Sequence, residues 1–168
     1  MFHYYLKILI LYTVCIGTVS CWSYSFSEKA LPGIDTIAVP LFIDRTNENQ
    51  IRERLQSSII TIFMDENVFS VVGQNQADAI LSGAIEVIRD VPTQINRNEF
   101  ASQFEIQITV LVKLEEKNSG NVLLSERLLG TGLYTEPLGE GEGSRDVAVN
   151  QALEQITRDI IDKISSGW

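Results

Sequence analysis

Apolar and polar residues alternate over much of the second half of the chain. Between Phe104 and Leu114 every second residue is apolar, and the residues between them are mostly polar or charged. A period of two predicts a β-strand with one buried face and one face open to solvent. The turn signal Asn118-Ser119-Gly120 then predicts that residues 122–134 return as the partner strand of a hairpin.

Two other segments have the spacing of amphipathic helices. The first is expected over about residues 48–64, and the second is expected after a cap at Ser144. Charged and amide side chains occupy the opposite side of each segment, so the apolar stripes are expected to face a core. The stripes consist of Ile51, Leu55, Ile59, Ile62 and Phe63 in the first helix, and of Ala148, Ala152, Ile156 and Ile160 in the second.

Shorter apolar runs predict the remaining strands. Residues 36–42 form a first strand with Pro40 at an edge or a bulge, residues 68–72 a short strand, and residues 78–91 a longer one. Residues 92–98 and 136–144 are polar or glycine-rich and are expected to be loops. The pattern therefore predicts an α+β two-layer sandwich, with two helices packed on one face of a mostly antiparallel four-stranded sheet.

The amino terminus has the pattern of an export signal. Lys7 precedes an uncharged run over residues 8–19, and the small residue Ser20 follows it. This run is shorter than the roughly 20 residues that a membrane-spanning helix needs, so residues 1–20 are interpreted as a cleaved lipoprotein signal peptide. An uncleaved anchor or a buried N-terminal helix is the alternative interpretation.

Cys21 directly follows the small residue at the end of this run. The arrangement resembles a bacterial lipobox, in which the cysteine is acylated and becomes the first residue of the mature protein. A disulfide with Cys15 is the alternative, but cleavage after Ser20 would remove that partner. We therefore expect a lipid anchor on Cys21, a lipidated tether over residues 21–34 and an α+β domain over residues 35–168.

Composition excludes several classes of function. The chain contains one histidine, His3, which lies within the predicted signal peptide. Catalytic triads and histidine-based zinc sites are therefore not expected in the mature protein. Removing residues 1–20, which contain Lys7 and no acidic residue, changes the formal net charge from −9 to −10. Such an acidic chain is not expected to bind nucleic acid. Residues 65–67 lack the ligand pattern of a calcium loop, and we expect neither a metal nor an enzyme activity.

A binding role is the remaining hypothesis, and the polar face of the hairpin is where we expect it. Lys113 and Arg127 are the candidate side chains for contacting a lipid or a protein partner. An ordinary solvated sheet face is the alternative interpretation.

The order of motifs resembles the LptE family of lipopolysaccharide-assembly lipoproteins. The resemblance rests on Cys21 followed by Tyr24-Ser25-Phe26, on Ile37-Ala38-Val39-Pro40-Leu41-Phe42, on Ala77-Asp78-Ala79-Ile80-Leu81-Ser82-Gly83, on the long hairpin and on the terminal helix. It implies a protein anchored by its lipid to the periplasmic face of the outer membrane. It also implies that the protein plugs the barrel of an LptD-type partner, helps to place lipopolysaccharide and catalyses no reaction.

Two alternatives stay open, an enzyme that uses only carboxylates and a different envelope lipoprotein. The apolar first strand, the helix and the Asp78-containing strand are also similar to the amino-terminal modules of other envelope lipoproteins. Such a lipoprotein would bind a periplasmic protein instead of an outer-membrane barrel.

Overall fold

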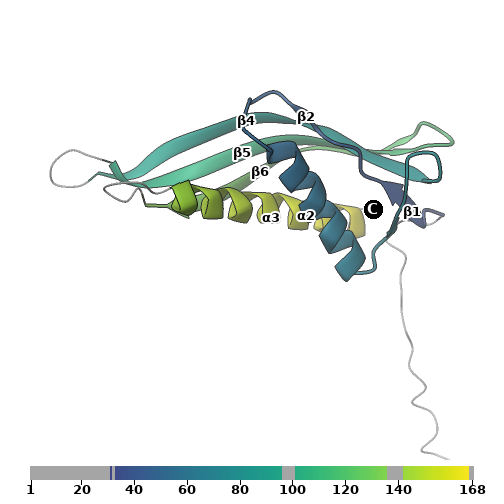
Figure 1. Cartoon of the computed structure of the whole chain (residues 1–168). Helices are drawn as coiled ribbons and strands as arrows, with labels where there is room; N and C mark the ends of the chain where they lie inside the picture. The colour runs from purple at the N-terminus through teal and green to yellow at the C-terminus, as the bar shows by residue number, and fades with distance from the viewer. Residues whose placement is uncertain (1–30, 32, 96–100, 136–141, 167–168) are drawn as a thin grey trace, which may run out of the picture.

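Two helices pack against the same face of a six-stranded sheet in the computed structural model (Figure 1). The structure describes residues 31, 33–95, 101–135 and 142–166, so the expected signal peptide and Cys21 lie outside the described residues. The elements in chain order are β1 (Thr36–Ala38), β2 (Ile43–Asp44), α2 (Ile51–Asp65), β3 (Ser70–Val71), β4 (Ala79–Ile95), β5 (Ala101–Glu116), β6 (Val122–Tyr134) and α3 (Glu142–Ser166).

The sheet is mixed. Its order is β3-β1-β4-β5-β6, and β2 also pairs with β4. Strands β4, β5 and β6 are antiparallel as expected, whereas β1 pairs in parallel with β3 and β4, and β2 pairs in parallel with β4. The α+β sandwich is thus confirmed, but the mostly antiparallel four-stranded sheet was wrong. The reason is that α2 lies in the crossover from β1 to β3, and a helical crossover returns the chain in the same direction.

The expected strand over residues 36–42 is divided in two. Between β1 and β2 the chain leaves the sheet at Pro40, which has no N–H to donate to a neighbouring strand. Phe42 turns into the core and is 1% exposed. It packs on Gly83, where a Cβ atom would lie 2.6 Å from the Phe42 ring and 2.2 Å from the carbonyl oxygen of Leu111. The glycine of the Leu-Ser-Gly motif therefore makes room for the aromatic ring.

Two expected loops are shorter than the sequence predicted. Strand β4 continues through Pro92 to Ile95, and in the described residues β1 and β2 pair with it only as far as Ile85. Proline is tolerated there because that edge of β4 needs no N–H for a partner strand. Helix α3 already begins at Glu142, so Ser144 lies inside its first turn and does not cap it. Residues 96–98 and 136–141 of the expected loops lie outside the described residues.

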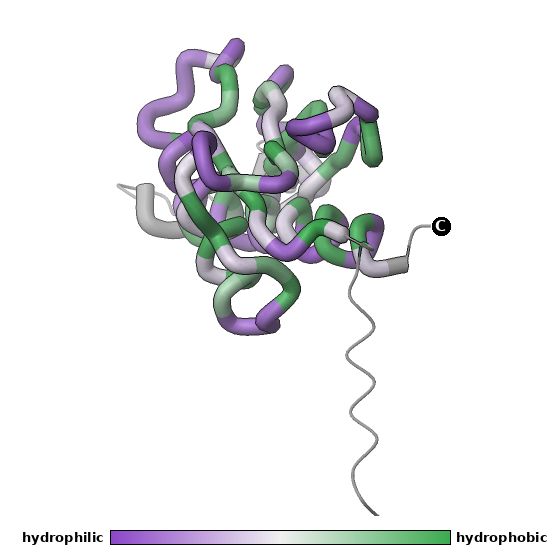
Figure 2. Tube along the Cα trace, turned by 90° about the vertical axis from the view of Figure 1, so that its right-hand side faces the viewer, coloured by the Kyte–Doolittle hydropathy of each residue, from purple (hydrophilic) through white to green (hydrophobic). Residues whose placement is uncertain are grey.

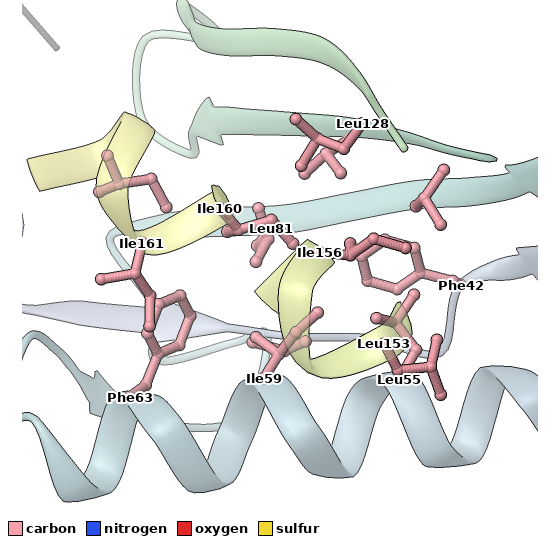
Figure 3. Packing of buried hydrophobic residues seen from close by; sticks show 14 of the residues in the cluster. Phe42, Leu55, Ile59, Phe63, Leu81, Leu128, Leu153, Ile156, Ile160 and Ile161 are labelled. Carbon is pink, nitrogen blue, oxygen red and sulfur yellow. The ribbon is translucent and has the colours of Figure 1, made fainter. Parts of the chain in front are cut away.

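The core lies between the sheet and the two helices. Figure 2 shows apolar and polar residues interleaved along the chain, and Figure 3 shows buried side chains of α2 and α3 packed together below the strands. The alternating residues of β5 supply the sheet side of this core, as their period predicted. Its members include Ile106, Ile108, Val110, Val112 and Leu114 from β5, Ile51, Leu55, Ile59 and Phe63 from α2, and Ala148, Ala152, Ile156 and Ile160 from α3.

Helix α3 lies with its backbone directly on β6. A Cβ atom at Gly130 would be 2.1 Å from the carbonyl oxygen of Ala152, and one at Gly132 would be 2.1 Å from that of Ala148. Between these glycines the N–H of Thr131 donates to Oε1 of Gln155 over 3.1 Å. Small residues on both elements thus permit a close approach that larger side chains would prevent.

Asp78 joins the starts of β1 and β4. Its Oδ2 accepts hydrogen bonds from the Thr36 hydroxyl (2.7 Å), the Thr36 N–H (2.9 Å) and the Asp35 N–H (3.1 Å). In return the N–H of Asp78 donates to Oγ1 of Thr36 over 3.0 Å. The hydrogen bond from the Thr36 side chain is the main reason why the pKa of Asp78 is below its usual value, with the two backbone N–H groups adding to it.

We expect Asp78→Asn to destabilise the fold in a pH-dependent manner. Because the folded protein lowers the pKa of Asp78, the stabilisation by the carboxylate is present above the unfolded pKa of about 3.9 and is lost as the pH falls through the folded value. The variant should therefore have a lower urea midpoint than the wild type at pH 7, and the difference should shrink below about pH 4. A difference that stays constant down to pH 2.5, or an equal loss in the exposed control Asp65→Asn, would contradict this assignment.

Candidate functional site

The sheet has one face that the two helices of the described residues do not cover. Figure 1 shows α2 and α3 on the same side of β4, β5 and β6, and the side chains that alternate with the buried residues point to the other side. We call this surface the open face. It is formed by Val87, Arg89 and Val91 of β4, by Glu105, Gln107, Thr109, Leu111 and Lys113 of β5, and by Ser125, Arg127, Leu129, Thr131 and Leu133 of β6.

Apolar side chains are exposed on one half of the open face. Val87 and Leu129 stand on either side of Thr109, and their exposed fractions are 38% and 47%. Four residues further along β6, Leu133 is 54% exposed beside Glu105. These three aliphatic residues share one face of the sheet, which makes this face a candidate for contact with another molecule.

A cluster of ion pairs lies around Glu86 on the open face. This residue lies at a bulge of β4, where the register with β5 shifts between Ile85 and Val87. Its carboxylate accepts a hydrogen bond from Nε of Arg127 over 2.8 Å and lies 3.7 Å from Nη1 of Arg45. The Glu86 side chain is 16% exposed, against 66% and 58% for the two arginines. The cluster therefore has an excess of one positive charge, and its guanidinium groups face solvent.

The two candidate residues of the sequence analysis lie together on this face. Lys113 is opposite Ser125 and Arg127 is opposite Leu111, so the two basic side chains are diagonal neighbours on β5 and β6. Lys113 forms an ion pair with Glu115, two residues along the same strand. The two side chains share a face and are 44% and 66% exposed, and their role in binding stays a prediction. Cys21, the predicted lipidation site, lies outside the described residues.

Sequence reasoning missed the partners of Arg127. Glu86 is separated from it by 41 residues along the chain, and the bulge that places Glu86 on this face leaves no signal in the apolar period. The pair of Lys113 and Glu115 could have been found, because residues two apart in a strand share a face.

The arrangement suits recognition by contact. Within the described part of the chain no group of three or more His, Cys, Asp or Glu side chains is placed to hold a metal ion. The helices described here are also too short or too polar to cross a membrane. The open face offers aliphatic side chains beside arginine and lysine groups, which is a combination that complements an amphipathic surface.

Comparison with known proteins gives a consistent picture. The model of the family LptE, described as lipopolysaccharide-assembly, matches residues 34–165. The fold is similar to that of the rare lipoprotein B from Shewanella oneidensis (10% identity, TM-score 0.56, covering 79% of this chain and 95% of that one). It is also similar to lipoprotein B from Nitrosomonas europaea (11% identity, TM-score 0.57, covering 79% of this chain and 83% of that one). A third similar structure is a minor lipoprotein from Acinetobacter baumannii (13% identity, TM-score 0.52, covering 79% of this chain and 92% of that one). A search of curated proteins found no match.

Proposed function

Because this chain belongs to the LptE family, we propose that it is an outer-membrane lipoprotein that acts as the plug and partner of an LptD-type β-barrel. The observation that carries the proposal is the family match over residues 34–165, which includes every strand, helix α2 and all but the last residue of α3. The similar folds of three bacterial lipoproteins support an envelope lipoprotein. In this role the protein assists lipopolysaccharide assembly by binding and catalyses no reaction.

The lipid on Cys21 holds the protein at the periplasmic face of the outer membrane in this proposal. Residues 1–20 are the signal peptide that is removed, residues 21–34 are the tether, and residues 35–168 are the domain that enters the barrel. Several acyl chains, each contributing about 0.8 kcal/mol per buried methylene, make such an attachment effectively permanent.

The open face is the surface that we assign to the partner. Val87, Leu129 and Leu133 would contact apolar parts of the barrel or of the transported lipid. Lys113 and Arg127 would contact carboxylates of the partner or the anionic groups of lipopolysaccharide, because each ends in an exposed cation. The outer surfaces of the two helices would then face away from this contact.

Affinity purification of the full chain from detergent-solubilised outer membranes tests the proposal. A plug is expected to be recovered with one large β-barrel protein in a fixed ratio, and mass spectrometry would identify it. Recovery with soluble periplasmic proteins alone would contradict the plug and support the alternative of a different envelope lipoprotein.

Leu129→Gln combined with Leu133→Gln is expected to weaken the recovery of the barrel by about tenfold, since a buried aliphatic contact at an interface contributes on the order of 1 kcal/mol. The matched control is Met64→Gln, because Met64 is 64% exposed but lies on α2 in the other layer. Equal recovery with the double variant and with the control would show that the open face is not the contact surface.

A further inference from the structure

Arg145, in the first turn of α3, binds two carboxylates at once. Its Nη1 and Nη2 donate to Glu48 over 2.9 Å and 3.3 Å, and its Nε and Nη2 donate to Asp90 over 3.1 Å each. The side chain is 30% exposed. The hydrogen bonds to Glu48, followed by those to Asp90, raise the pKa of Arg145 above its usual value, so the guanidinium keeps its charge. Forked contacts of this kind hold both carboxylates in a defined orientation.

The position of this arginine is unfavourable for the helix alone. The amino-terminal end of a helix carries a partial positive charge, so a cation in the first turn is repelled. The contacts of Arg145 therefore do not stabilise α3 by itself but connect it to other elements. Asp90 Oδ1 also accepts a hydrogen bond from the hydroxyl of Tyr134 over 2.9 Å. The cluster of Arg145, Glu48, Asp90 and Tyr134, which we call the charge junction, joins α3, the segment before α2, β4 and β6.

The charge junction lies beside the part of β4 that pairs with neither β1 nor β2 in the described residues. In the described residues, β1 and β2 pair with β4 no further than Ile85, and the bulge at Glu86 follows directly. Beyond the bulge, β4 over residues 87–95 is paired with β5 on one side alone. We call residues 87–95 together with residues 101–109 of β5 the distal end of the hairpin. A bulge permits a local bend, and Asp90 connects this length of β4 to a helix.

The surroundings of the charge junction on the helix side are polar. A hollow of about 580 Å³ lies beside it, lined by Glu48, Asn49, Gln50, Arg54, Arg145, Asp146 and Asn150, all of them polar. Arg54 is held by Asp146 and Asn150, and Arg145 by Glu48 and Asp90, so both arginines of the hollow are already neutralised. The hollow is thus a polar gap between elements, and its cations are not free for a ligand.

We propose that Arg145 is a latch that fixes the distal end of the hairpin to the helices, and that its release opens this end locally while the rest of the core stays folded. The bulge at Glu86 is the boundary of the part that moves. This inference goes beyond the proposed function and does not rest on it, because it concerns the folded domain without its partner.

Hydrogen exchange of the full chain in detergent tests the latch, with Arg145→Gln as the variant. Backbone amides of residues 87–91 are expected to exchange faster by about tenfold or more, since local opening raises exchange in the segment that opens and leaves other segments unchanged. Amides of residues 36–38 and 110–114 should exchange as in the wild type. Asp90→Asn should have the same local effect, and the double variant should add little to either single variant because the two residues share one contact.

Arg158→Gln is the matched control, because Arg158 is an exposed arginine of α3 whose ion pair with Glu154 stays within the helix. Exchange that is unchanged in Arg145→Gln, or that increases equally in all segments, would overturn the latch. If Arg145→Gln does not fold, the wild type in about 1 M salt replaces it, since salt screens half-exposed ion pairs. Faster exchange confined to residues 87–91 then supports the latch, and its absence overturns it.

Discussion

Gly130→Ala is expected to lower the free energy of unfolding by about 3 kcal/mol, the upper part of the range for overpacking a rigid contact. The new Cβ atom would lie 2.1 Å from the carbonyl oxygen of Ala152 and 2.8 Å from Cγ1 of Ile156. The nearest of these atoms belongs to the backbone of α3, so the helix itself must move away from β6. Since α3 covers the buried residues of β5, this movement loosens the core. Urea unfolding followed by circular dichroism measures the loss.

Gly73→Ala is the matched control for this substitution. No atom lies within 4 Å of the Cβ position at Gly73, and its backbone is not in the left-handed region. An alanine there is expected to change the stability by less than about 1 kcal/mol, because it reduces the freedom of the unfolded chain without a clash. Equal urea midpoints for the two variants would mean that α3 does not approach β6 as closely as the structure has it.

Cys21→Ser is expected to release the protein from the membrane completely. If the thiol of Cys21 carries the acyl chains, a hydroxyl at this position leaves the domain without an anchor, and with two such chains lost the membrane affinity falls by many orders of magnitude. The measurement is the distribution between the membrane pellet and the soluble periplasmic fraction. Intact mass of the wild type should show cleavage before Cys21 and the added mass of the lipid.

Cys15→Ser is the control that separates the two cysteines. Cys15 lies inside the apolar run of the predicted signal peptide, so its loss should leave the protein in the membrane fraction. A wild-type mass that still includes Met1 would contradict the lipid anchor, and so would a Cys21→Ser variant that stays in the pellet although its residues 1–20 have been removed. Either result would also remove one support of the outer-membrane proposal, while the family membership would stand.

The long elements of the fold could be predicted because their periods are unbroken. The expected helix over residues 48–64 corresponds to α2, Ile51–Asp65, and the expected return strand corresponds to β6, Val122–Tyr134. The parallel part of the sheet could not be predicted in this way. β2 and β3 have two residues each, which is too short for a period, and their pairing depends on where α2 brings the chain.

The open face was predictable in its composition but less so in its contacts. The alternation in β5 placed Lys113 on the exposed side, and the regular hairpin register placed Arg127 beside it. The bulge at Glu86 and the two-carboxylate contact of Arg145 bring together residues that are 41 to 97 positions apart. Such contacts follow from the tertiary structure and leave no local pattern.

The place of α3 in the chain order sets a condition on biogenesis. This helix covers the apolar underside of β5 and β6, yet it follows every strand that it covers. A chain that emerges in sequence order exposes the apolar underside of this hairpin until α3 has also emerged, and such exposed apolar surface promotes aggregation. The sandwich is therefore complete only when this last helix has docked on the hairpin.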